Sequence, residues 1–197
     1  MADSIVDGTG TGNRVAVFSD NKLSTRTVNS SEVQDAAAEG RAWNFNTGWI
    51  SSISANSALL YFKNDESDGS DFFIDAIAVG FKDGSATDVQ SVYFVSSPTG
   101  GTLVDAATDA DMISDRLMGE GNTLSARTMV YKATASGQTL TGGIDAALFA
   151  QNDQGRLFAT VDFVVPKGQS CGIRLEVGGS FSGDVYAAFV GHKRKVL

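Results

Sequence analysis

The sequence predicts an all-β protein, an antiparallel β-sandwich of jelly-roll type with an extended N-terminal arm. The 197-residue chain contains 22 glycines but only 2 prolines, and its apolar residues fall in short runs between polar turns, which is typical of strands joined by tight turns. Roughly eight to ten such runs follow Trp43, and no helical repeat alternates with them. We place a boundary near Gly40, with residues 1–40 as the arm and residues 41–197 as the sandwich.

The stretch from Arg41 to Lys82 gives the clearest strand signal, and we expect it to form four strands separated by turns or loops. Its last part alternates strictly, as in a strand with two different faces. The two faces carry Phe73, Asp75, Ile77, Val79 and Phe81 on one side and Phe72, Ile74, Ala76, Ala78 and Gly80 on the other. The second face is small or apolar throughout and is predicted to meet the core. The first also carries large apolar side chains, so we expect a second sheet or a neighbouring subunit to cover it.

The other elements are predicted from short runs bounded by turn residues. In the arm we expect strands over Arg14–Phe18 and Lys22–Val28, then a short helix over Glu32–Glu39. Leu103–Met118 fits either a short helix or a loop, and Asn152–Gly155 predicts a hairpin. The remaining sandwich strands are predicted at Val89–Ser96, Ala126–Ala133, Ile144–Ala150, Arg156–Val165, Gly172–Val177 and Val185–Gly191.

The charge balance argues against two classes of partner. The formal net charge is −8 and the isoelectric point is about 4.5, whereas binding to nucleic acid or to anionic membranes needs clustered cations. The N-terminus has no basic segment followed by an apolar one, so we expect no secretory signal. No apolar run approaches the roughly 20 residues of a membrane helix. We therefore expect a soluble protein made in the cytosol.

The chain is poorly supplied with the residues of common catalytic and zinc sites. It has one cysteine and one histidine, which together cannot provide four zinc ligands. Cys171 lies in an apolar run and is predicted to be an inert core residue. His192 lies next to the C-terminus among basic residues, a poor place for a catalytic triad. We expect no enzymatic activity and no cofactor.

Two acidic segments could hold a hard cation. The first is Asn64–Asp71, where alternating oxygen ligands followed by Gly69 resemble part of a calcium loop, with Asp68 and Asp71 as the candidate ligands. It lacks the final bidentate glutamate, and a solvated hairpin loop is the favoured interpretation. The second segment contains Asp105, Asp109, Asp111 and Asp115 and is either a solvated loop or a cation site at a subunit boundary.

Two tryptophans flank a short polar segment and allow a different function. Trp43 and Trp49 lie on either side of residues 44–48. Tryptophan in a strand is more often buried, so packing in the core or between subunits is favoured. Exposed tryptophans on a sandwich can instead form a platform for sugar rings, which makes a carbohydrate-binding module the alternative from another class.

Two segments carry a resemblance to a known group of proteins. They are residues 44–64, NFNTGWISSISANSALLYFKN, and residues 165–177, VPKGQSCGIRLEV. Together with the order of features along the chain, they resemble tailed-bacteriophage virion structural proteins that have a β-sandwich domain. The resemblance implies a capsid decoration (cement) protein on the virion, bound to the major capsid protein and assembled as a homo-oligomer, with a trimer favoured. A collar, tail or fibre-base component is the close alternative.

This interpretation assigns partner contacts to three regions. The arm, through Val15, Val17, Phe18 and Leu23, is expected to contact a capsid subunit and to become ordered on binding. The face that carries Phe73 and Phe81 is expected to pack against a symmetry mate. The basic C-terminal residues Lys193, Arg194 and Lys195 form either a solvated tail or a contact with an acidic partner surface.

Overall fold

The structure is a computed structural model of the chain, and the parts that it describes are residues 4–6, 14–16, 36, 41–82, 89–106, 111–114, 129–152, 156–178 and 181–194. The chain divides into two compact units, Met1–Ser31 and Glu32–Leu197. In the first unit, β1 (Ser4–Val6) pairs antiparallel with β2 (Arg14–Ala16).

The first unit differs from the predicted arm in how its strands pair. The strand expected over Arg14–Phe18 is confirmed at its first three residues, but its described partner is β1. The expected partner, Lys22–Val28, lies outside the described residues. Of the helix predicted over Glu32–Glu39, the structure describes Ala36 alone, which is helical and buried.

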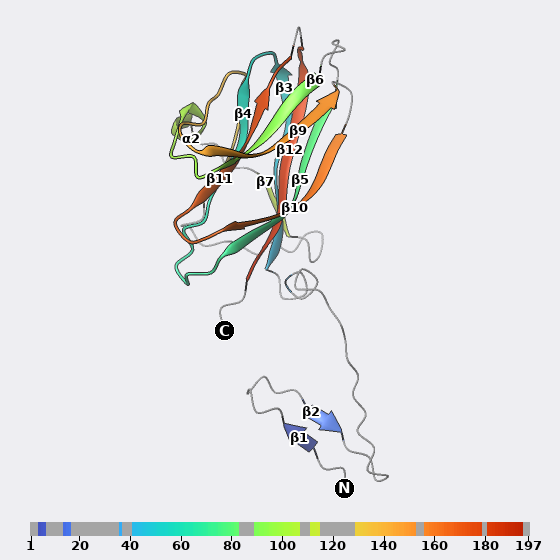
Figure 1. The fold of residues 1–197 in the computed structure, drawn as a ribbon, viewed down its shortest axis with the longest axis vertical. Coiled ribbons are helices and arrows are strands. Elements are labelled where there is room, and N and C mark those ends of the chain that lie inside the picture. The colour runs from blue at the N-terminus through green and yellow to red at the C-terminus, as the bar shows by residue number, and fades with distance from the viewer. Residues whose placement is uncertain are drawn as a thin grey trace. The chain divides into compact units, whose positions relative to one another are not determined.

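The second unit is an all-β sandwich of two five-stranded sheets, as predicted, and every described strand pair is antiparallel (Figure 1). The first sheet has the order β10–β5–β12–β3–β7, and the second has the order β8–β4–β11–β6–β9. The strands are β3 (Ala42–Ile53), β4 (Ser57–Lys63), β5 (Phe72–Lys82), β6 (Val89–Ser96), β7 (Asp111–Ser114), β8 (Met129–Lys132), β9 (Ile144–Asn152), β10 (Arg156–Val165), β11 (Ser170–Glu176) and β12 (Gly183–Lys193). A five-residue helix, α2 (Thr102–Ala106), begins the segment that fitted either a helix or a loop.

Aromatic rings from both sheets form the centre of the core. Phe62 of the second sheet lies 4.9 Å from Phe72 and 5.5 Å from Phe45 of the first sheet, measured between ring centroids. Trp43 stands 5.6 Å from Phe72. All four side chains are buried, and aromatic contacts at this spacing add to the stability gained by burying apolar area. The apolar runs on which the strand predictions depended therefore do meet across two layers.

The outer face of the second sheet is covered locally. Leu140 packs against Gly172 of β11, where an added Cβ would lie only 2.5 Å from a Leu140 methyl carbon. The position requires glycine because the added Cβ would also lie 2.9 Å from the backbone carbonyl oxygen of Leu60, which cannot move aside as a side chain can. Leu103 of α2 is also buried in the core cluster. Such covering explains why six of the seven residues of β4 are buried, although a strand with one solvated face would alternate.

One of the turns predicted between the strands of residues 41–82 is instead part of a continuous strand, β3. The segment around Gly48 is part of a continuous strand that contains two bulges, where β3 has one residue more than the paired β12. The bulges coincide with positive φ at Gly48 (63°) and Ser52 (59°). The Thr47 hydroxyl accepts a hydrogen bond from the Ala187 amide (2.9 Å), and an Asp184 carboxylate oxygen accepts one from Ser52 (3.2 Å). Side chains thus satisfy backbone groups at each irregularity.

A bulge in β5 corrects the predicted division of that strand into two faces. Asp75 is the extra residue relative to β12, because Val190 pairs with Ala76 whereas Gly191 pairs with Ile74. Before the bulge Phe72 and Ile74 face the core as expected, but after it the core residues are Ile77, Val79 and Phe81. Ala78 and Gly80, predicted to face the core, line the outer surface instead. The layer that covers Phe81 is therefore the protein's own second sheet.

The predicted hairpin at Asn152–Gly155 is wrong. Strand β9 ends there and β10 begins there. However, β9 pairs with β6 in the second sheet, whereas β10 pairs with β5 in the first. The connection passes from one sheet to the other. Turn residues mark where a strand ends, but they do not determine which strand becomes its neighbour.

Candidate functional site

The outer face of the first sheet carries one row of side chains across four strands. Trp49 on β3 pairs with Tyr186 on β12, which pairs with Gly80 on β5, which pairs with Arg156 on β10. Paired residues of neighbouring strands project from the same face of a sheet. Four residues that are distant in the sequence therefore form a single line, with a gap at the glycine.

The gap forms the floor of a groove. A Cβ placed on Gly80 would lie 3.4 Å from the tip of the Trp49 ring and 3.9 Å from the Arg156 side chain. Ala78, the next outward residue of β5, pairs with Phe158 of β10. The groove is open to solvent and has a volume of about 410 Å³, within the range of small-molecule sites.

The rings along the groove are unusually accessible to solvent. The exposed fraction is 43% for Trp49 and 67% for Phe158. The rings of Trp49 and Tyr186 are tilted against each other with centroids 5.9 Å apart, and burial raises the pKa of the Tyr186 hydroxyl. Exposed large aromatic side chains that gather at one hollow are an informative deviation from ordinary burial.

Charged groups adjoin the aromatic rings. The Lys82 ammonium lies 5.1 Å from the Trp49 ring centroid and 3.3 Å from an Asp184 carboxylate oxygen. The Arg156 side chain belongs to the opposite wall. The site therefore combines apolar ring faces with hydrogen-bond donors and an acceptor, which suits a ligand that is itself part apolar and part polar.

The two tryptophans have different environments. Trp43 is buried in the core, as the favoured interpretation predicted for both residues. Positions 43 and 49 are an even number of residues apart, so in a strand without a bulge Trp49 would lie on the same face as Trp43. The bulge at Gly48 reverses the alternation, so Trp49 points outward whereas Ile50 points into the core.

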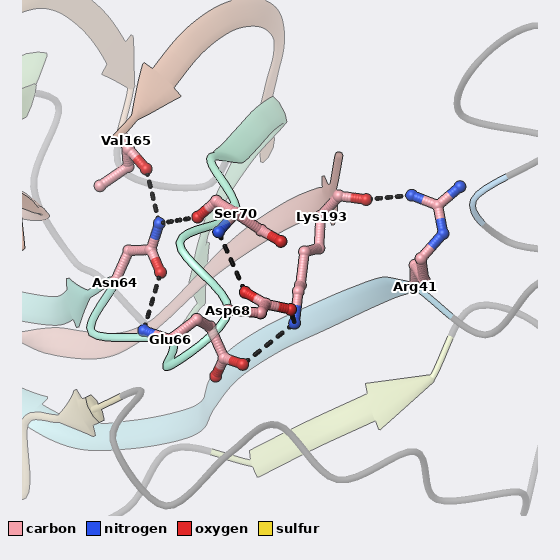
Figure 2. A network of polar contacts seen from close by, with 7 residues as sticks. All are labelled: Arg41, Asn64, Glu66, Asp68, Ser70, Val165 and Lys193. Carbon is pink, nitrogen blue, oxygen red and sulfur yellow. Dashed lines mark hydrogen bonds and ion pairs between the residues drawn. The ribbon is translucent and has the colours of Figure 1, made fainter. Parts of the chain in front are cut away.

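The acidic loop of residues 64–71 is held by a lysine (Figure 2). The Lys193 ammonium lies 2.7 Å from a carboxylate oxygen of Asp68 and donates a 3.0 Å hydrogen bond to Glu66. Glu66 is buried, and the Lys193 side chain is largely so. The Arg41 guanidinium donates to the Lys193 carbonyl oxygen. The loop is thus packed against β12, which differs from the solvated hairpin that was favoured.

The same ion pairs bear on the predicted calcium ligands. Asp68 uses one carboxylate oxygen for Lys193 and the other to accept a 3.0 Å hydrogen bond from the Ser70 amide. Asp71 contributes its backbone carbonyl to the Arg194 amide. Within the described residues, no group of three or more acidic, histidine or cysteine side chains is placed to hold a metal ion. Of the second acidic cluster, Asp109 and Asp115 lie outside the described residues.

Acid should weaken this contact, because hydrogen bonding from Lys193 lowers the pKa of Asp68 from 3.8 to about 2. Between these values the unfolded chain binds more protons than the folded one, so stability present above pH 3.8 should be lost as the pH falls toward 2. We expect the thermal midpoint of Lys193→Met to depend less steeply on pH in this window than that of the parent. Differential scanning fluorimetry from pH 2 to pH 5 provides the comparison, and identical slopes would contradict it.

The first residue of the basic C-terminal segment is built into the sheet, and the next follows the strand and donates its backbone amide to Asp71, so neither is part of a free tail. Lys193 is the last residue of β12, and its acidic partners are Glu66 and Asp68 of the same chain. The guanidinium of Arg194 lies 5.7 Å from the ring centroid of Phe73. Lys195 lies outside the described residues.

His192 is likewise part of β12 and not of a frayed end. It is buried, its Nδ1 lies 2.8 Å from a carboxylate oxygen of Asp75, and its ring stacks on Phe73 with centroids 5.2 Å apart. The half-buried Phe73 is therefore engaged on its own sheet by His192 and Arg194.

The remaining predicted contact residues differ in position. Phe81 is 4% exposed and meets Phe181 edge to face, so it is a core residue and is not available to a partner. Val15 lies in β2. Val17, Phe18 and Leu23 lie outside the described residues.

Cys171 is buried in the core cluster, as predicted, and burial raises the pKa of its thiol. A thiol in this state is a weak nucleophile. None of the helices in the described ranges is long and apolar enough to span a membrane.

Comparisons with known protein families, with curated proteins and with solved structures found no match for this chain. The resemblance to phage virion proteins therefore stays a prediction. The groove was missed at the sequence level, apart from Trp49, because its walls come from four separate strands. Gly80 inside an otherwise apolar alternating run was the one local signal, since glycine in a strand often marks a close approach.

Proposed function

We propose that this protein is a non-enzymatic structural protein of a tailed-phage particle, a decoration protein that binds the major capsid protein on the outer shell. The sandwich would form the body of each copy, and the N-terminal unit would provide attachment. A collar, tail or fibre-base position is the alternative within the same class.

The observation that carries this proposal is the order of the strands. When β3, β4, β5, β6, β9, β10, β11 and β12 are numbered 1 to 8 along the chain, the sheets have the orders 6-3-8-1 and 2-7-4-5. This order supports the jelly-roll assignment, an architecture found in viral capsid and lectin domains. Strands β7 and β8 extend one edge of each sheet. Fold alone does not define function, and the resemblance of residues 44–64 and 165–177 is what favours a phage particle.

The N-terminal unit supports an attachment role. Its described strands, β1 and β2, have three residues each and form a two-stranded sheet. A two-stranded hairpin by itself is at best marginally stable in water. Docking against a partner surface would stabilise it, as expected for a segment that becomes ordered on binding.

Purified phage particles should contain this chain in high copy number. Closed icosahedral symmetry multiplies each surface site, so shell decoration predicts on the order of hundreds of copies per particle. Quantitative mass spectrometry against the major capsid protein measures the ratio. A count of roughly a dozen or fewer would favour the collar, tail or fibres, and absence from the particle would refute the proposal.

A truncation separates attachment from folding. Deleting residues 1–13 removes β1 and should leave the sandwich folded while weakening binding to particles that lack the protein. Circular dichroism measures folding, and cosedimentation with these particles measures binding. Unchanged binding by the truncated protein would refute the role of the N-terminal unit.

A further inference from the structure

We propose that the groove between Trp49 and Tyr186 on one side and Arg156 and Phe158 on the other is a saccharide-binding site. The proposal depends on the outer face of the first sheet alone and is independent of whether the protein decorates a capsid. Its occupant would be a pyranose ring within a glycan chain.

The aromatic rings provide the apolar half of the recognition. A pyranose presents C–H groups on its faces and hydroxyl groups around its rim, so one face can lie against an aromatic ring while the rim is hydrogen-bonded. Trp49 is 43% exposed and Phe158 is 67% exposed, on opposite sides of the floor. Gly80 and Ala78 keep that floor low, so a ring can enter between the walls.

The charged side chains provide the polar half. The Arg156 guanidinium has five N–H donors, and its side chain lies on the wall opposite Trp49. The Lys82–Asp184 pair beside Trp49 adds a donor and an acceptor. Hydrogen bonds to ionised groups are stronger than neutral ones. Arg156 is also placed to bind the carboxylate of an acidic sugar.

A saccharide fits this site better than a protein surface does. The groove is lined by eight residues, whereas a stable protein interface uses about 20 to 30 residues on each side. The volume of the groove, about 410 Å³, falls within the range of small-ligand sites.

Fluorescence titration of the full-length protein with chitohexaose, maltohexaose and oligogalacturonate tests the proposal. Trp49 and Trp43 are the two tryptophans of the chain, and the buried Trp43 serves as an internal reference. We expect at least one saccharide to change the emission of Trp49. Trp49→Ala should abolish that change and weaken binding about tenfold or more in calorimetry, because an entire stacking surface is removed.

Matched variants localise the site. Ala78→Leu should block the floor while leaving Trp49 in place, and it should weaken binding about as much as Trp49→Ala. Val164→Ala changes an exposed residue of the same strand as Phe158, outside the groove, and should bind as the parent does. Circular dichroism on each variant verifies folding. A preference for oligogalacturonate that Arg156→Gln removes would support the site and assign an acidic sugar, whereas similar binding of neutral saccharides would support it and assign a neutral one.

Two outcomes would overturn the proposal. The first is that none of the three saccharides binds. If the oligomeric state of Trp49→Ala also shifts in sedimentation velocity, that outcome would assign the groove to a protein contact. The second is binding that Trp49→Ala and Ala78→Leu leave unchanged.

Discussion

Replacing Phe81 with aspartate should leave most molecules with an unfolded sandwich domain under native conditions. Phe81 is 4% exposed, belongs to the core cluster and meets Phe181 edge to face at 5.8 Å. Removal of a buried phenylalanine costs about 3–5 kcal/mol, and an unpaired carboxylate in its place adds a desolvation penalty. The sum approaches the total stability of an ordinary domain, about 5–15 kcal/mol. Urea denaturation followed by circular dichroism should detect the loss.

Phe73→Asp is the matched control, because the same substitution is made on the same strand. Phe73 is half-buried and lies beside His192 and Arg194, two groups that can approach a carboxylate. We expect a loss of about 1–2 kcal/mol, typical of a surface contact. Equal destabilisation by the two variants would contradict the placement of these residues on opposite faces of β5.

Strand positions were predictable wherever an apolar run was bounded by turn residues. β6 was expected over Val89–Ser96 and has those bounds, and β10 likewise coincides with Arg156–Val165. Burial of apolar side chains determines these elements, and the apolar pattern is local in the sequence. The partner of each strand is not local information, which is why the Asn152–Gly155 segment suggested a hairpin although β9 and β10 belong to different sheets.

Bulges account for the errors in predicted faces. Strict alternation assigns a face by parity, and one extra residue reverses every later assignment. Asp75 does so in β5, which brings Phe81 to the core, and Gly48 does so in β3, which brings Trp49 to the surface. Asp75 has no sequence feature that marks a bulge, whereas a glycine inside a strand, such as Gly48, often does.

The candidate site was harder to predict than the fold, because its members meet only through strand pairing. Trp49, Gly80, Tyr186 and Arg156 form one row on four strands. The basic C-terminal residues were misjudged for the same reason. Lys193 is distant in sequence from Glu66 and Asp68, and their ion pairs exist because β12 runs beside the 64–71 loop.

Asn64→Ala should destabilise the sandwich by about 2–4 kcal/mol, since two buried carbonyl groups would lose their donor. The Asn64 side-chain amide donates 2.9 Å hydrogen bonds to the carbonyl oxygens of Ser70 and Val165, and its own oxygen accepts one from the Glu66 amide (Figure 2). Asn64 follows β4 in one sheet, whereas Val165 ends β10 in the other. One amide therefore joins the two connections that pass between the sheets at this end of the sandwich.

Asn56→Ala tests whether this effect depends on burial. The Asn56 side-chain oxygen accepts a 2.8 Å hydrogen bond from the Val177 amide, but Asn56 is exposed and water can replace it. Its loss should cost about 0.5–1 kcal/mol. Urea denaturation of both variants gives the comparison. A large effect at Asn64 with a small one at Asn56 means that the buried amide stabilises both connections between the sheets, whereas similar small effects would mean that water enters and satisfies the carbonyl groups of Ser70 and Val165.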